Sequence, residues 1–214
     1  MAPRKRKRRR RLNPRFVALV LALVLIGTGG AVYLRSRSLP GGRVSVPDYV
    51  EKDYLTVNPW SRPETPLKKI DGVVIHYVGN PGTTARANRN YFESLSAGTD
   101  QVYASAHFVV GLEGEVIQCI PLTEIAYASN SRNEDTVSIE VCHPDADGAF
   151  SQVTYDRVVE LTAWLCESFQ LDPGADVIRH YDVTGKECPL YYVDHPDAWE
   201  QLKSDVAAAV KQDG

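Results

Sequence analysis

The 214-residue sequence predicts an α/β fold: a single domain with a central mixed β-sheet flanked by helices, preceded by one N-terminal transmembrane helix. Beyond residue 70, short runs of β-branched and aromatic residues predict strands, and two amphipathic patterns predict helices that cover them. A long uncharged apolar run near the N-terminus predicts the membrane span. The length allows one ordinary globular domain or at most a small pair.

The N-terminal region combines a basic run with the apolar run. Residues 4–11 are all Lys or Arg, and residues 16–34 carry no charge. At about 1.5 Å per helical residue the apolar run reaches about 28 Å, close to the hydrocarbon thickness of a bilayer. We therefore expect a basic cytoplasmic tail over residues 1–15 and a transmembrane signal anchor over residues 16–34.

More cations precede the span than follow it, which predicts a single-pass protein of the cytoplasmic membrane with its N-terminus in the cytoplasm. The folded domain is then expected on the extracellular side. A cleavable signal peptide is the alternative, because residues 27–31 (GTGGA) supply small residues. The long apolar run and the lack of an A-x-A site favour the uncleaved anchor.

The segment after the span is rich in Pro and Gly and is expected to be irregular. We predict a tether over residues 35–53 and the folded domain over residues 54–214. Residues 44–214 hold 12 basic against 27 acidic residues, a net charge of about −15. Such an acidic domain argues against nucleic acid as a ligand.

The domain's elements follow from residue patterns in chain order. Apolar runs bounded by turn residues predict strands at 73–78, 104–110, 115–120 and 136–142, with a short last strand at 176–181. A helix is expected across 84–95. Apolar residues on one helical face predict helices at 153–169 and, after Pro196, at 196–212.

Two histidines and a cysteine are candidate metal ligands. His76 and His180 each end a predicted strand, where side chains reach the rim of a sheet. Cys188 follows His180 after eight positions through a loop that contains a glycine. Two imidazoles and one thiolate, with a fourth position left to water, form a known catalytic zinc set. Structural histidines packed in strands are the alternative interpretation.

Two charged residues are further candidates. Glu140 is expected in the middle of a strand, and a buried unpaired carboxylate is costly unless it is paired, protonated or part of a site. Lys186 lies two residues before Cys188, where it could stabilise an oxyanion. The alternatives are a structural ion pair for Glu140 and an exposed loop charge for Lys186.

These residues lie in four ordered blocks that together are far more specific than any single motif. The blocks read GVVIHYVGNPGTTARANRNYF, ASAHFVVGLEGEVIQCIP, AYASNSRNEDTVSIEVCHPD and VIRHYDVTGKECPLYYV. Over about residues 54–211 the chain resembles the zinc-dependent N-acetylmuramoyl-L-alanine amidases of the type-2 amidase superfamily, which also contains peptidoglycan recognition proteins. The resemblance implies that residues 54–214 form a zinc amidase catalytic domain.

The resemblance implies one Zn²⁺ per chain, held by His76, His180 and Cys188. It also implies that Glu140 moves the proton of the attacking water and that Lys186 stabilises the oxyanion. The bond cut would join N-acetylmuramic acid to the L-alanine of the stem peptide. The phage lysozyme-type branch has a catalytic Tyr where this sequence has Ala106, so its Tyr-dependent mechanism does not apply.

The expected partner is therefore peptidoglycan or soluble muropeptides on the cell-wall side of the membrane. We expect Asn88, His107 and Arg132 to bind substrate, although His107 fits a packed strand histidine equally well. The second hypothesis is a non-catalytic peptidoglycan-binding receptor on the same fold. With Cys188 assigned to zinc, three cysteines remain, and no structural disulfide is expected.

Overall fold

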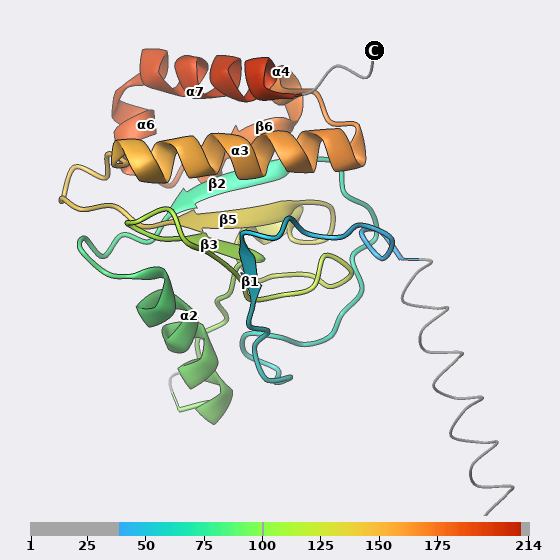
Figure 1. The fold of residues 1–214 in the computed structure, drawn as a ribbon. Helices are drawn as coiled ribbons and strands as arrows, with labels where there is room; N and C mark the ends of the chain where they lie inside the picture. The colour runs from blue at the N-terminus through green and yellow to red at the C-terminus, as the bar shows by residue number, and fades with distance from the viewer. Residues whose placement is uncertain (1–38, 100, 211–214) are drawn as a thin grey trace, which may run out of the picture. The chain divides into compact units, whose positions relative to one another are not determined.

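The computed structural model describes residues 39–99 and 101–210, which contain a mixed sheet and the helices that flank it (Figure 1). The predicted basic tail and membrane span lie outside the described residues. Within the described ranges, no helix is long and apolar enough to cross a membrane.

The sheet has six strands in the order β1-β4-β3-β5-β2-β6. The strands are β1 (Val50–Lys52), β2 (Val73–Tyr77), β3 (Phe108–Val110), β4 (Val116–Gln118), β5 (Val137–Val141) and β6 (Val177–Arg179). Strands β3, β5, β2 and β6 run parallel, and β4 is antiparallel to β3. The predicted mixed sheet is confirmed, and its parallel part brings the carboxyl ends of β2, β5 and β6 to one edge.

Strand β1 differs from the sequence prediction, because it lies within the range expected to be a tether. It pairs in parallel with β4, Val50 opposite Val116, at the edge of the sheet. Only Val50 of its three residues is buried. A three-residue edge strand with one buried side chain leaves no alternating pattern in the sequence, so the tether prediction is corrected here by the pairing that the tertiary structure supplies.

Helices cover both faces of the sheet. Helix α3 (Gln152–Phe169) and helix α7 (Pro196–Ala209) lie together on one face, and α2 (Ala85–Ser94) lies on the other (Figure 1). Thr84 and Ser151 cap the N-termini of α2 and α3: the side-chain oxygen of each accepts one backbone N–H from the first turn of its helix. The three predicted helices are therefore present, with boundaries that differ from the predicted ones by at most three residues.

Shorter elements complete the fold, and the sequence patterns did not predict them as helices. They are η1 (Leu95–Ala97), η2 (Asn130–Arg132), α4 (Pro173–Asp176), α5 (His180–Thr184) and α6 (Leu190–Asp194). Helices of three to five residues are too short to show a 3.6-residue apolar period.

Side chains of the central strands alternate between two environments. Val137, Ile139 and Val141 of β5 join a large apolar cluster with α3 and α7. Ser138 and Glu140 face the other side of the sheet, where α2 contributes Ala85 and Phe92 to a smaller cluster. The register pairs His76 of β2 with Glu140 of β5, so these two polar residues are neighbours on the same face.

Candidate functional site

The candidate site lies where β2, β5 and β6 end. His76 and Glu140 are the second-to-last residues of β2 and β5, and His180 directly follows β6. Because these strands run parallel, their carboxyl ends bring the three side chains to one edge of the sheet. The imidazole rings of His76 and His180 are 4.6 Å apart between centroids.

Cys188 reaches the same place by a sharp reversal of the chain. Helix α5 ends at Thr184, and the residue that caps it, Gly185, adopts a left-handed conformation with φ of 76°. Glycine takes this conformation without the steric cost that a Cβ atom would add. The Tyr181 backbone N–H then donates to the Cys188 carbonyl at 2.9 Å, which holds the returning chain beside His180.

His76, His180 and Cys188 form a group that could hold a metal ion. One candidate ligand atom from each residue lies within 4.8 Å of the others. The Cys188 Sγ lies 3.8 Å from the His76 Nδ1. All three residues are buried, with exposed fractions of 2%, 6% and 2% respectively. The structure thus brings together the three residues that the sequence singled out as ligands.

Each histidine uses its other ring nitrogen in a hydrogen bond to one loop. The His76 Nε2 lies 3.1 Å from the Ser129 Oγ, and the His180 Nε2 lies 3.0 Å from the Asn130 Oδ1. The His180 Nδ1 is buried and has no hydrogen-bond partner among the described residues. A buried nitrogen lone pair without a donor is costly, and a bound cation would satisfy it.

Electrostatics favour neutral imidazoles at this site. Burial, with contributions from His180 and Lys186, lowers the pKa of His76 well below its ordinary value. Burial and Lys186 lower the pKa of His180 as well. Burial and the neighbouring Glu140 raise the pKa of the Cys188 thiol to about 12. Neutral imidazoles are ready to ligate a metal, and the thiol needs a nearby cation to become a thiolate.

Glu140 lies beside the ligands in an unpaired state. Its Oε1 is 4.0 Å from the His76 Nδ1, and its side chain keeps an exposed fraction of 18%. Its Oε2 is buried without a hydrogen-bond partner among the described residues. Burial raises the pKa of Glu140 to about 8, against a lowering by Lys186. A carboxyl group whose pKa lies near neutrality is suited to take up and release protons.

A hollow of about 200 Å³ opens over these groups. The three ligand residues, Glu140 and Lys186 line it, and aromatic side chains form much of the remaining wall. The aromatic residues are Tyr77, Phe92, Tyr103 and Tyr127. Buried nitrogen and sulfur atoms, a protonatable carboxyl and a lysine thus face one space that is open to a ligand.

Comparison with known proteins shows the family of the chain. The family described as N-acetylmuramoyl-L-alanine amidase matches residues 66–190, a range that contains His76, Glu140, His180, Lys186 and Cys188. The chain belongs to this amidase family.

Similar proteins include two amidases of Bacillus. N-acetylmuramoyl-L-alanine amidase BlyA of Bacillus subtilis (strain 168) is 34% identical over 175 residues, which cover 72% of this chain and 46% of BlyA. N-acetylmuramoyl-L-alanine amidase CwlL of Bacillus licheniformis is 32% identical over 156 residues, 67% of this chain and 42% of CwlL. This chain therefore spans less than half the length of these two relatives.

Solved structures share the fold. The catalytic domain of XlyA superposes with a TM-score of 0.61 at 25% identity, over 73% of this chain and 98% of that one. The structure of PlyL gives a TM-score of 0.61 at 21% identity, over 73% of this chain and 96% of that one, and this likeness concerns the fold alone.

The three residues predicted to bind substrate do not line the hollow over the candidate ligands. His107 is buried, with its Nδ1 accepting the Ser138 backbone N–H at 3.0 Å and its Nε2 donating to the Glu124 carbonyl at 2.9 Å. Asn88 on α2 donates to Thr83 and to the Thr84 carbonyl. Arg132 pairs with Asp135 at 2.8 Å. The geometry fits the packed strand histidine that the sequence analysis named as the alternative for His107.

Four residues of the site were missed by the sequence analysis. Ser129 and Asn130 bond the two histidines, and Tyr103 and Tyr127 line the hollow. Tyr103 packs between Trp60, at 4.9 Å between ring centroids, and Tyr127, at 5.4 Å. Polar loop residues and scattered tyrosines carry no spacing signal, so only their position beside the histidines reveals them.

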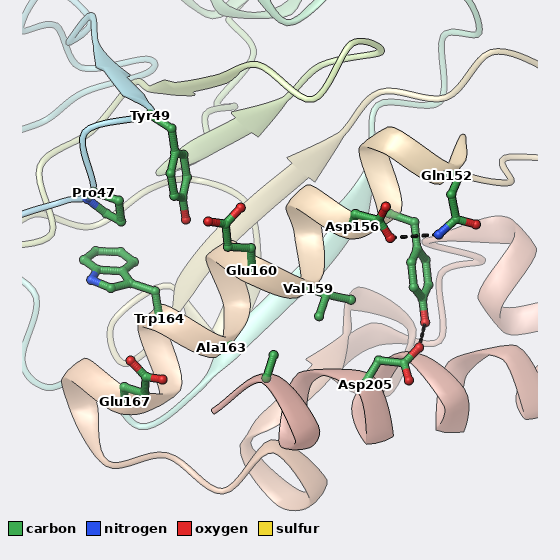
Figure 2. A pocket seen from close by; sticks show the side chains of 12 residues that line it. Pro47, Tyr49, Gln152, Asp156, Val159, Glu160, Ala163, Trp164, Glu167 and Asp205 are labelled. Atoms are coloured by element: carbon green, nitrogen blue, oxygen red, sulfur yellow. Dashed lines mark hydrogen bonds between the residues drawn. The ribbon is translucent and has the colours of Figure 1, made fainter. Parts of the chain in front are cut away.

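A larger hollow of about 610 Å³ lies against α3 and α7 (Figure 2). Acidic and aromatic side chains line it, but several of the carboxylates already have partners. The Tyr155 hydroxyl donates to Asp205 at 2.6 Å, Gln152 donates to Asp156 at 2.7 Å, and Arg157 pairs with Glu160 at 2.7 Å. None of the predicted site residues of this amidase-family domain lines this larger hollow.

Proposed function

We propose that this chain is a peptidoglycan amidase, which hydrolyses the bond between N-acetylmuramic acid and the first L-alanine of the stem peptide. One observation supports the proposal above all others. The unpaired Glu140 carboxyl lies in the same hollow as the His76, His180 and Cys188 group, in a chain of the amidase family.

We propose one Zn²⁺ as the resident metal, held by His76, His180 and Cys188. Two nitrogens and one sulfur suit zinc and leave its fourth position free. The unpartnered His180 Nδ1 fits a metal ligand, and both outer Nε2 atoms already have oxygen partners. Bound zinc supplies a Lewis acid that polarises the amide carbonyl and makes water a stronger nucleophile at neutral pH.

The residues of the chain then perform the remaining steps. Glu140 accepts a proton from the attacking water and delivers a proton to the departing L-alanine nitrogen, which turns it into a leaving amine. Its raised pKa suits the second half, the delivery of a proton, and a cation held by the three ligands would favour the carboxylate that the first half requires. The Lys186 ammonium, which also lines the hollow, stabilises the negative charge on the carbonyl oxygen as the tetrahedral species forms.

We also propose that residues 16–34 anchor the chain in the cytoplasmic membrane and that the domain acts on the cell-wall side. The apolar run and the excess of cations before it support this proposal. The anchor would keep an acidic domain close to its substrate by raising the local concentration. Protease treatment of intact cells should degrade the domain and leave residues 1–15 protected; the reverse pattern would contradict the orientation.

The activity is tested by mass spectrometry of muropeptides incubated with the full chain in mild detergent. Zinc-loaded protein should release intact stem peptides from the lactyl group, and treatment with a chelator should abolish release until zinc is restored. The Lys69→Ala variant, which changes an exposed residue outside the site, should retain activity. Binding of muropeptides and zinc without release would contradict the amidase and favour the receptor.

A further inference from the structure

One short loop contacts both candidate histidine ligands. Residues 128–133 (ASNSRN) connect a wall of the hollow to the start of β5, and they include η2. Ser129 lies 3.1 Å from the His76 Nε2, and the next residue, Asn130, lies 3.0 Å from the His180 Nε2. Two consecutive side chains therefore bond the two rings, each through the Nε2 atom.

The chemistry of Asn130 determines the protonation of its partner ring. The amide Oδ1 can only accept a hydrogen bond, so the His180 Nε2 must carry the proton. In a neutral imidazole the Nδ1 is then an unprotonated lone pair. That nitrogen is the buried atom without a partner, which agrees with a ring prepared to bind a cation.

Ser129 plays the corresponding part for His76. Its hydroxyl can donate or accept, and as an acceptor it leaves the His76 Nδ1 unprotonated. That Nδ1 faces the Cys188 Sγ at 3.8 Å. Ser129 is 1% exposed, so water does not compete freely for this bond.

The loop is itself held in place by internal bonds. The Asn133 Oδ1 accepts the backbone N–H groups of Ala128 and Ser129 at 3.1 and 2.6 Å. The Thr136 hydroxyl donates to the Arg132 carbonyl at 2.6 Å. Asn130 has a φ of 51°, a left-handed conformation that asparagine adopts more readily than most residues. The sequence thus supplies a residue that tolerates the backbone geometry and carries the required oxygen.

We propose that Ser129 and Asn130 are positioning residues, which together set the tautomers and orientations of His76 and His180 for a divalent cation. The inference rests on the proposed function, because it assigns outer partners to the ligands of the proposed zinc site. Neither residue needs to touch substrate or metal. Outer hydrogen-bond partners of this kind typically change metal affinity by about 10- to 100-fold when they are removed.

The test measures zinc affinity of the full chain by chelator competition, together with nitrogen NMR of the histidine rings in the metal-free protein. Asn130→Gly removes the side chain while glycine keeps the left-handed backbone, and Ser129→Ala removes the hydroxyl at nearly constant volume. We expect each variant to weaken zinc binding by about 10-fold or more. The His180 ring should lose its fixed Nε2–H tautomer in Asn130→Gly.

Two further variants separate positioning from folding. Asn130→Asp keeps an acceptor oxygen at the same place and should restore both the affinity and the tautomer. Ser131→Ala alters an exposed residue of the same loop and should change neither. Unchanged affinity and an unchanged His180 tautomer in Asn130→Gly would overturn the inference.

The same experiment distinguishes failure of the inference from failure of the proposed function. If the unaltered chain bound no zinc, the proposed zinc amidase would be overturned. The ring tautomers of the metal-free variants would then still decide whether the loop sets them, because that measurement does not require metal.

Discussion

The two faces of the central sheet differ in how their buried groups are satisfied. On one face, Val137, Ile139 and Val141 pack with α3 and α7 in an apolar cluster. On the other face, one residue away along the same strand, Glu140 has a buried oxygen without a hydrogen-bond partner among the described residues. The first face stabilises the fold, whereas the second face retains polar groups at a cost that packing must offset.

The two hollows follow the same division. The larger one, against α3 and α7, contains carboxylates that are bonded to neighbouring side chains (Figure 2). The smaller one contains His180 and Glu140 with unpartnered buried atoms. The larger hollow has one such atom in its lining, the Tyr49 hydroxyl, whereas the smaller has two, both within the group of candidate ligands and Glu140. The clustering of unpartnered buried groups, and not size, therefore identifies the candidate site.

The largest expected effect comes from Glu140→Gln. The change keeps the shape of the side chain and removes its ability to exchange a proton, so the rate of amide hydrolysis should fall by about 10²- to 10⁴-fold. Stability should change far less, because burial raises the pKa of Glu140 to about 8 and the metal-free carboxyl is largely uncharged at pH 7. Muropeptide turnover and urea unfolding measure the two quantities.

The Glu140→Gln variant should still bind one zinc per chain, since Glu140 is not among the three ligands. Turnover equal to that of the unaltered chain, with zinc bound, would remove Glu140 from the proposed chemistry and weaken the contrast between the two faces.

The opposite face is tested by Leu161→Ala. Leu161 is fully buried on α3, and removing its side chain leaves a cavity in the apolar cluster. The free energy of unfolding should fall by about 2–5 kcal/mol, as measured by urea denaturation. Turnover per folded molecule should remain close to that of the unaltered chain.

Leu161→Met is the matched control, because it nearly conserves volume and should cost less than about 1.5 kcal/mol. A large loss of turnover in folded Leu161→Ala would show that the two faces are coupled rather than separate.

Acid sensitivity should depend on His107, which is buried on the polar face away from the hollow. Burial lowers the pKa of His107 to about 4, although its bond to the Glu124 carbonyl opposes the shift. In the unfolded chain His107 takes up a proton near the ordinary histidine pKa of about 6.5, whereas in the native chain it takes up that proton only near pH 4. Stability contributed by this group is therefore present above pH 6.5 and is lost as the pH falls toward 4.

The slope should reach about 1.4 kcal/mol per pH unit, for a total of up to about 3 kcal/mol. Urea unfolding of the metal-free chain between pH 7 and pH 4 measures this slope. The His107→Gln variant should take up one proton fewer on unfolding, so its slope should be smaller by about 1.4 kcal/mol per pH unit. Parallel pH profiles for the two proteins would contradict the assignment.

The smallest effect is expected from Tyr155→Phe in the larger hollow. The variant loses the hydrogen bond from the Tyr155 hydroxyl to Asp205, which should cost about 1 kcal/mol of unfolding free energy. The rate of amide hydrolysis should not change, because this hollow lies on the face opposite the candidate site. A loss of turnover without a loss of stability would give the larger hollow a part in the reaction.

The central strands were predictable because they are buried on both faces. Residues 73–78 are a nearly continuous apolar run, residues 136–142 alternate apolar with small or polar residues, and the structure places β2 and β5 there as neighbours in the sheet. The edge strand β1 was not predictable from its three residues, since only Val50 is buried. Its position depends on pairing with β4, which is distant in the sequence.

The candidate ligands were predictable for a different reason. His76 and His180 end recognisable strands, Cys188 follows at a suitable spacing, and the four blocks resemble a known family. The structure confirms that the three residues meet, whereas His107, Asn88 and Arg132 bond elsewhere in the domain. A strand pattern tells which face a residue occupies, but it does not tell which buried partner satisfies it.

The sequence by itself determined the mixed α/β architecture and the three covering helices, and it singled out His76, Glu140, His180 and Cys188 as candidate site residues. Local periodicity and ordered motifs suffice for these features. Only the tertiary structure decided that Glu140 has a buried unpaired oxygen and that Ser129 and Asn130 bond the two histidines. Such contacts join residues about 50 positions apart, and their energies depend on burial, which exists only once the chain has folded.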